Sequence, residues 1–173
     1  MLFEENLQAI QMKKLFLLLI TLLFISNFSY AQTTVQKFFS VDWNASYKSI
    51  QSLYPKVKFT EKIFPDIREI CFNETIDSVN VKVGFFFDKN RILFAKAINN
   101  LDKDNRSGQK FFDVFKSYSV KYLGDKYASQ EVYSAFVLTW NLGADVIVML
   151  SHKDQKAALT ISKKRQVKNS TGD

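Results

Sequence analysis

The side chains best suited to catalysis are few in this chain and lie far apart in the sequence. It has one histidine, His152, and one cysteine, Cys71. No serine lies in a Gly-x-Ser-x-Gly context, which would present a nucleophile on a strand-to-helix turn. A hydrolase with a histidine base would have to centre on His152, which lies in a polar, turn-like stretch. We therefore predict no catalytic residues.

Metal and cofactor sites are equally poorly supported. One histidine and one cysteine cannot build a zinc site of the usual kind. The segment Asp102–Gly108 has a weak likeness to a calcium loop, but Arg106 occupies a ligand position and no late glutamate follows. We interpret this segment as a polar turn that caps a helix. The five glycines are scattered and form no phosphate-binding loop. We predict no metal and no cofactor, and we expect Cys71 to be a small buried hydrophobic residue.

Basic residues outnumber acidic ones, 24 to 17, for a net charge of +7. The charge is scattered except for a cluster of Lys163, Lys164, Arg165 and Lys168, which we predict to be a flexible tail over residues 163–173. The tail is either simply solvated or attracted to anionic lipid or polysaccharide of a cell envelope. We expect no nucleic-acid partner, because the chain also carries an export pattern.

That export pattern lies within residues 1–31. Lysines after Met12 precede an apolar run, Leu15–Ile25, and small residues precede a cleavage point after Ala31. The run is too short to span a bilayer, so a cleaved signal peptide is favoured over an uncleaved anchor helix. We predict that Met12 is the true start and that the mature protein reaches the periplasm or the outside of the cell, with no transmembrane span left.

A hairpin organises the remaining chain. Apolar and mostly polar residues alternate over Val79–Phe87, which is the period of a strand with one buried face. Asp88–Asn90 has turn chemistry, and Ile92–Ile98 reads as the returning strand. Because a lone hairpin is at best marginally stable in water, other elements must cover it.

Two amphipathic helices can supply the cover. In the first, Trp43, Tyr47 and Ile50 form a helical stripe that Pro55 ends, with Asp42 or Asn44 as the cap. The second is predicted over Gln109–Leu123, with Ser107 or Asn105 as its cap and Gly124 after its end; its stripe comprises Phe111, Phe112, Phe115, Tyr118 and Tyr122.

Further strands are predicted at Ile67–Phe72, Val132–Trp140, Asp145–Ser151 and Ala157–Ser162. Residues 56–65 read as irregular, apart from a possible short strand at 57–59. Residues 73–78 read as a polar connection. The fold class is α+β: a mostly antiparallel sheet of about six strands with two helices on one face, in α-β-β-β-α-β-β-β order. We expect one domain over residues 32–162. Its halves, 42–98 and 107–162, repeat the same order and are either pseudo-repeats or a chance likeness.

This order resembles the two-repeat arrangement of the beta-lactamase inhibitory protein fold. It is also similar to small exported proteins of unknown function from Bacteroidetes-type genomes, whose second half has an aromatic helix, a glycine stop and a strand with a tryptophan. Here those features are Phe111–Tyr122, Leu123-Gly124 and Trp140. The resemblance covers roughly 42–162 and implies a fold; it carries over no functional residues.

Some strands of the second half are apolar on both sides, as with Ile147 and Met149 opposite Val148. Either the lead-in with Phe38 and Phe39 or the loop at 56–65 covers the second face, or that face is an apolar patch for a partner or a dimer.

We predict an exported, non-enzymatic binding module, whose partner is another envelope protein or an anionic envelope polymer. The alternatives are an envelope-polymer hydrolase with unidentified carboxylates and a membrane-surface assembly factor. The candidate binding residues are Trp140, Tyr133, Lys163, Lys164 and Arg165.

Overall fold

The computed structural model describes residues 34–163 of the chain. The chain divides into two compact units, 1–36 and 37–173, and the account below concerns the second. The predicted upstream extension, signal peptide and cleavage site lie outside the described residues, as does the predicted tail beyond Lys163.

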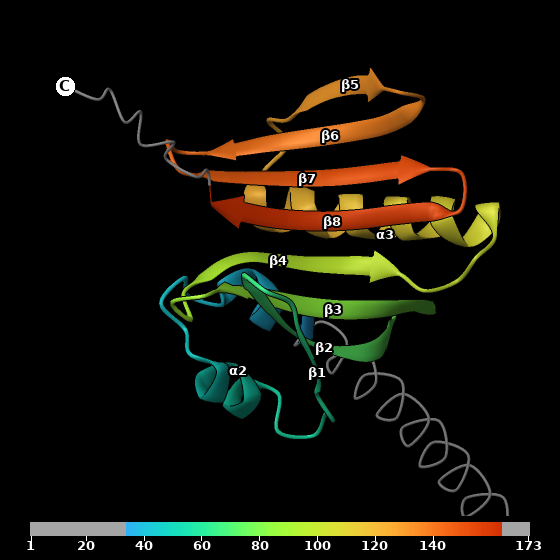
Figure 1. The fold of residues 1–173 in the computed structure, drawn as a ribbon. Helices are drawn as coiled ribbons and strands as arrows, with labels where there is room; N and C mark the ends of the chain where they lie inside the picture. Colours follow the sequence, from blue (N-terminus) through green and yellow to red (C-terminus); the bar gives the residue numbers. More distant parts are fainter. Residues whose placement is uncertain (1–33, 164–173) are drawn as a thin grey trace, which may run out of the picture. The chain divides into compact units, whose positions relative to one another are not determined.

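The described part of this unit is built around one eight-stranded sheet, which is antiparallel throughout. Its order is β1-β2-β3-β4-β8-β7-β6-β5, so two runs of four consecutive strands meet where β4 pairs with β8 (Figure 1). The strands are β1 (Thr60–Ile63), β2 (Ile67–Ile76), β3 (Val79–Asp88), β4 (Leu93–Asn100), β5 (Ala128–Val132), β6 (Ala135–Leu142), β7 (Val146–Lys153) and β8 (Lys156–Lys163).

The helical segments in the described part are residues 34–40, α2 (Tyr47–Leu53) and α3 (Asn105–Leu123). Phe38 packs on Phe85 with ring centroids 6.1 Å apart, and Tyr54, at the end of α2, packs on the same ring at 6.0 Å. Figure 1 shows α3 running along the far side of β7 and β8. Residues 37–40, α2 and α3 cover one surface of the sheet, which we call the helix face. Across this face the register aligns five buried residues: Phe85, Lys96, Ile161, Val148 and Trp140.

Our prediction of about six strands and two helices was wrong, because this part of the chain has eight strands and three helical segments. One extra strand, β1, lies in the stretch 56–65 that we read as mostly irregular. The other is β5, which shares only Val132 with the predicted strand Val132–Trp140 and otherwise lies before it, whereas β6 corresponds to the rest of that strand. The observed order is therefore a helical part followed by four strands, twice.

Two tight turns explain these errors. Tyr133 and Ser134 both have positive φ, 49° and 62°, and so do Asp77 and Ser78, at 47° and 62°. Two central residues with positive φ are typical of the hairpin turn whose twist matches the flanking strands, and Asn-Gly is its usual sequence. Tyr-Ser and Asp-Ser carry no such signal. The polar connection that we predicted at residues 73–78 is instead the end of β2 and one of these turns.

The central hairpin is confirmed. All five alternating apolar residues of β3 are buried, from Val79 to Phe87. In the turn that follows, Asp88 Oδ1 accepts hydrogen bonds from the backbone N–H groups of Asn90 and Ile92, each at 2.9 Å. The turn chemistry predicted for Asp88 therefore operates as expected.

Helix α2 is shorter than predicted and begins elsewhere. Its cap is Ser46, whose hydroxyl accepts from the backbone N–H of Ser49 while the Ser49 hydroxyl accepts from the backbone N–H of Ser46. This reciprocal arrangement, rather than Asp42 or Asn44, satisfies the first N–H groups. Ile50 is fully buried, whereas Tyr47 is only half-buried.

Helix α3 has the predicted aromatic stripe on its buried side, including Phe111, Phe115 and Tyr118. Asp104, which we did not predict, is its cap and accepts from the backbone N–H of Ser107 at 2.8 Å. The helix ends at Gly124 as expected.

Candidate functional site

Cys71 and His152, whose side chains are the most reactive in the described part, make packing and hydrogen-bonding contacts within the fold. Cys71 is 5% exposed, and burial raises the pKa of its thiol, which disfavours the nucleophilic thiolate. His152 Nε2 lies 2.9 Å from the backbone oxygen of Asp154, and its ring lies 5.9 Å from that of Phe112. Within residues 34–163, no group of three or more His, Cys, Asp or Glu side chains is placed to hold a metal ion.

The sheet surface opposite the helix face, which we call the open face, carries small side chains along its central strands. The large apolar residues of these strands, such as Ile98 and Leu159, point to the helix face and are fully buried. Their neighbours point to the open face, where Ala97 is buried and Ala95, Ala158 and Thr160 are half-buried. On the open face the register sets Ala95 beside Ser162, Ala97 beside Thr160 and Asn99 beside Ala158.

Larger apolar side chains flank this central strip. On β7, Met149 is 40% exposed and Ile147 is half-buried, whereas Val148 and Leu150 are buried on the helix face, as predicted. Val137 of β6 is also half-buried on the open face.

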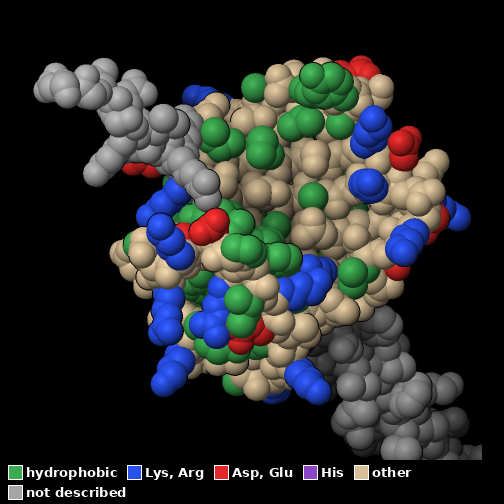
Figure 2. Space-filling view, viewed as in Figure 1, with side chains coloured by type: hydrophobic (Ala, Val, Ile, Leu, Met, Phe, Trp, Pro, Cys, Tyr) green, Lys and Arg blue, Asp and Glu red, His purple; other side chains and the backbone are tan. Residues whose placement is uncertain are grey.

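In Figure 2 few charged side chains lie over the middle of β4, β8 and β7. The middle of the open face, over β4, β8 and β7, is therefore weakly charged and partly apolar. Its edges are charged: Lys82 pairs with Glu69 on β3 and β2, and Lys153 and Lys156 lie at the β7–β8 end.

Neither of the predicted covers lies on the open face. Phe38 of the lead-in packs on Phe85, and Phe59 of the 56–65 stretch packs on Phe72 with centroids 5.2 Å apart. Phe72 and Phe85 are buried on the helix face. Both covering segments that we had considered therefore belong to the other side of the sheet.

A cavity of about 610 Å³ lies at one end of the open face, between the end of β4 and the β7–β8 turn. Asn100 ties its walls together, because its Nδ2 donates to the backbone oxygens of Asp102 at 3.0 Å and Gln155 at 3.4 Å. Volumes of this size can hold a small molecule or a partner's side chains. The lining includes the apolar Leu101, Ala135 and Ala158 and the charged Asp102, Lys103, Lys153 and Lys156.

A second cavity, of about 500 Å³, bears on the hydrolase alternative. Glu74 and Asp102 both line it, and Asp102 Oδ1 accepts a hydrogen bond from Asn80 Nδ2 at 3.2 Å. Neither carboxylate is buried. Both carboxylates are therefore partly accessible to solvent.

The structure separates the candidate binding residues that we predicted. Trp140 is 1% exposed, and its Nε1 donates to the backbone oxygen of Gly124 at 2.9 Å, so it belongs to the core. Tyr133 is 91% exposed at the β5–β6 turn. Lys163 ends β8 with its Nζ 5.5 Å from the ring centroid of Trp43. Lys164 and Arg165 lie outside the described residues.

One buried cation, Lys96, joins the lead-in to the sheet. Its Nζ donates to the backbone oxygens of Phe38, Phe39 and Val41 at 2.8, 3.1 and 3.1 Å. These oxygens end the helical segment 34–40 and lack intrahelical donors, so Lys96 acts as a cap for it. Burial lowers the pKa of Lys96 to about 8, with Asp42 acting in the opposite direction.

Sequence reasoning did not predict a third, basic cavity of about 340 Å³, lined in part by Tyr47, Lys48, Arg68 and Arg91. These residues come from α2, β2 and the β3–β4 turn, and no spacing in the sequence groups them. The available signal was the β2–β3 register, which sets Arg68 beside Phe87 and hence beside the next turn. That register depends on the Asp77-Ser78 turn that we did not recognise.

No family model matches this sequence, and no curated protein or solved structure shows significant similarity to it. None of the helices in the described part is long and apolar enough to cross a membrane. The geometry of the surfaces described above is therefore the basis for a functional proposal.

Proposed function

We propose that this protein is an exported, non-catalytic binding module of the cell envelope that binds a protein partner through its open face. The observation that carries the proposal is the middle of the open face, over β4, β8 and β7, a weakly charged surface of small and apolar side chains. Isolated apolar residues are normal on protein surfaces, but a contiguous apolar patch marks an interaction site. Export is supported by the residue pattern up to Ala31 alone.

The extent of the open face suits a protein partner better than a small ligand. With strands ~4.8 Å apart and ~3.3 Å per residue, eight strands of roughly eight residues offer at most ~900 Å². One side of a standard protein–protein interface buries ~800 Å². The low charge of its middle disfavours an anionic polymer there, because such a polymer would be held mainly by lysine and arginine, which on this face lie toward the edges.

We also propose that the two halves of the sheet are related to the two-repeat arrangement of the beta-lactamase inhibitory protein fold. Support comes from the order of elements, in which a helical part precedes four consecutive strands in each half. The halves meet edge to edge at β4 and β8. This relation concerns architecture, and it assigns no inhibitor activity or residue role to the chain.

Site-specific photo-crosslinking in cells tests the binding proposal. A photoreactive phenylalanine at Met149, on the open face, is expected to give a discrete adduct with one envelope protein. The same group at Ser117, exposed on α3, is the control and should give none. A Thr160→Arg substitution beside Met149 should abolish the adduct, because it places a long charged side chain in the central strip. Equal adducts at both positions, or an adduct unaffected by Thr160→Arg, would contradict the proposal.

A further inference from the structure

The basic cavity is lined by three cations and no carboxylate. Lys48 lies on α2, Arg68 on β2 and Arg91 in the β3–β4 turn, and Ser46, Tyr47 and Phe87 complete the lining. Among the described residues, neither Lys48 nor Arg91 forms an ion pair. Two cations without an ion-pair partner, beside a third, Arg68, that is paired only through Nε, favour an anionic ligand in this cavity.

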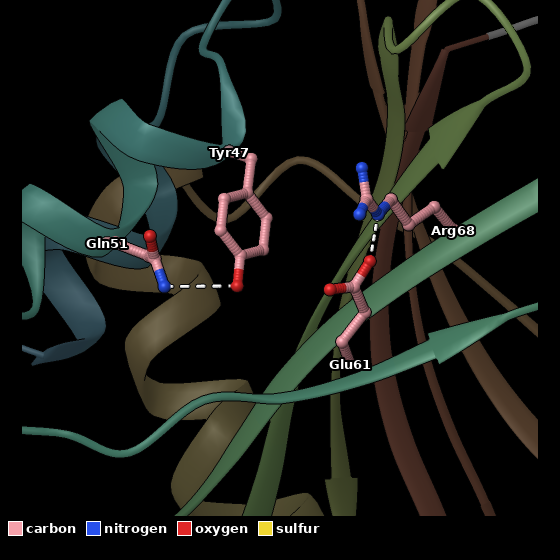
Figure 3. Close-up of polar contacts among 4 residues, drawn as sticks. All are labelled: Tyr47, Gln51, Glu61 and Arg68. Atoms are coloured by element: carbon pink, nitrogen blue, oxygen red, sulfur yellow. Dashed lines mark hydrogen bonds and ion pairs between the residues drawn. The ribbon is translucent and has the colours of Figure 1, made fainter.

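Arg68 is held in a fixed position on the wall of this cavity. Its Nε donates to Glu61 Oε1, and its guanidinium carbon lies 5.6 Å from the ring centroid of Tyr47. Tyr47 is fixed in turn, because its hydroxyl oxygen accepts a hydrogen bond from Gln51 at 3.0 Å. Figure 3 shows the guanidinium of Arg68 between Tyr47 and Glu61, with the contact to Glu61 made by Nε. Glu61 therefore occupies one edge of the guanidinium and leaves the other edge to bind a phosphate.

The turns next to the cavity expose large apolar side chains. Ile63 and Phe64, at the end of β1, are 75% and 52% exposed, and Ile92, next to Arg91, is 50% exposed. The register brings these turns together, because Ile63 pairs with Arg68 and Arg68 pairs with Phe87. In Figure 2 Lys and Arg side chains gather with hydrophobic ones over α2 and the adjacent strands.

Acidic groups at this end weaken the positive charge without cancelling it. Glu61 pairs with Arg68, and the carboxylate of Asp88 accepts backbone hydrogen bonds within its own turn. Asp66 is exposed on the β1–β2 turn, where Lys62 is also exposed. The basic cavity itself has no acidic residue in its wall.

We propose that the β1–β2 and β3–β4 turns dock on the surface of an anionic lipid bilayer. A lipid phosphate occupies the basic cavity, contacted by Lys48, Arg68 and Arg91, and the side chains of Ile63, Phe64 and Ile92 enter the interface. Basic side chains next to exposed apolar ones are the combination by which proteins bind an anionic membrane surface. A soluble phosphate or an anionic polysaccharide would use the cations and have no need of the three apolar side chains. This surface is separate from the open face, which remains free for a protein partner.

Vesicle co-sedimentation tests the proposal. The probes are vesicles of phosphatidylcholine alone and of phosphatidylcholine mixed with phosphatidylglycerol, at an ionic strength of about 0.15 M. The protein is expected to bind only the mixed vesicles appreciably. In the Lys48→Gln/Arg91→Gln double variant, binding should weaken about thirtyfold, since each basic side chain near an anionic bilayer contributes roughly fivefold. Lys103→Gln/Lys156→Gln, two exposed lysines at the opposite end of the sheet, is the control of equal charge and should retain most of the binding.

Two further variants separate the membrane from other anions and from unfolding. Ile63→Ser/Phe64→Ser should lose vesicle binding while keeping any binding of glycerol phosphate, and Phe64→Trp should show a blue shift of its fluorescence when mixed vesicles are added. Glu61→Gln should strengthen vesicle binding, because it frees the Nε of Arg68. Equal binding to both vesicle types, binding unchanged in Lys48→Gln/Arg91→Gln, or no spectral shift of Phe64→Trp would each overturn the proposal. Vesicle binding unaffected by Ile63→Ser/Phe64→Ser would overturn the proposed entry of these side chains into the bilayer interface.

Discussion

At the scale of single residues, Lys96 has the largest structural role among the polar side chains described. It is 2% exposed and donates to three backbone oxygens at the end of the helical lead-in. The rings of Phe38 and Trp43 lie 5.5 and 5.4 Å from its Nζ and add cation–π contacts. The lead-in is therefore fixed to the centre of the sheet by one amino group.

Replacing Lys96 by Met is expected to destabilise the protein by ~1–3 kcal/mol at pH 7, because buried carbonyl groups lose their donor. The effect should depend on pH. Below about pH 8 this lysine is protonated in both the folded and the unfolded protein, so it makes no contribution to the pH dependence of stability there. Between about pH 8 and 10.5, the ordinary pKa of lysine, the unfolded chain holds one more proton than the folded protein, so the stability of the wild type rises with pH through this residue.

The Met variant lacks this contribution, so the difference in stability between the two proteins should widen as pH rises through that window. Urea unfolding of both proteins at pH 7 and pH 9.5 measures it, because the ionisation of tyrosines cancels in the difference. If the difference in stability between the two proteins stays constant or narrows, the pKa of Lys96 in the folded protein is not lowered.

At the scale of elements, the first turn of α3 is set against the β7–β8 turn by a glycine. A Cβ atom at Gly108 would lie 2.7 Å from the backbone oxygen of Asp154 and 3.1 Å from His152 Nε2. The first contact is with backbone and cannot be relieved by turning a side chain. The close approach of α3 to this turn therefore requires glycine at position 108.

Gly108→Ala is expected to lower the free energy of unfolding by ~1–2 kcal/mol. Overpacking costs ~1–3 kcal/mol, and the higher helix propensity of alanine returns up to ~1 kcal/mol. Ser117→Ala, at an exposed position of the same helix, is the matched control and should be neutral or slightly stabilising. Thermal unfolding of the three proteins distinguishes these outcomes, and a Gly108→Ala protein as stable as the wild type would show that α3 does not approach the turn this closely.

Elements with a strong periodic pattern could be predicted from the sequence, and those defined by turns could not. The strand Val79–Phe87 and the aromatic stripe of α3 were recognised because burial of one face leaves a period of two or of 3.6 residues. The β5–β6 hairpin was missed because Tyr133 and Ser134 adopt positive φ without the glycine or asparagine that usually marks it. Strand β1 was missed because all four of its residues are exposed, so no apolar pattern marks it.

At the scale of the whole molecule, the candidate surfaces depend on pairings that one sequence does not contain. The apolar second face was visible in the strand pattern, at Ile147 and Met149, but whether another segment covers it depends on long-range packing. Trp140 was a poor choice of binding residue because an aromatic residue in a strand gives no sign of which face it takes. The basic cavity unites residues from 46 to 91 and needs the sheet register to bring them together.

The export pattern at the amino terminus predicts the first residue of the mature protein. The mature protein is expected to begin at Gln32, because cleavage after Ala31 leaves small residues at −3 and −1. Amino-terminal sequencing and intact mass of the protein recovered from the envelope or the medium measure this. Recovery of a chain that still carries Leu15–Ile25 would instead support an uncleaved anchor.

Cysteine accessibility tests the central claim, an open face that is solvent-exposed in the isolated protein and occupied by a partner in the cell. With maleimide, the purified Met149→Cys protein should react rapidly, whereas the native Cys71 should remain unmodified because it is buried. In intact cells that express the protein, Met149→Cys should be protected, while Ser117→Cys on α3 should react in both settings. Slow reaction of purified Met149→Cys, or equal reaction in the purified protein and in cells, would contradict the account.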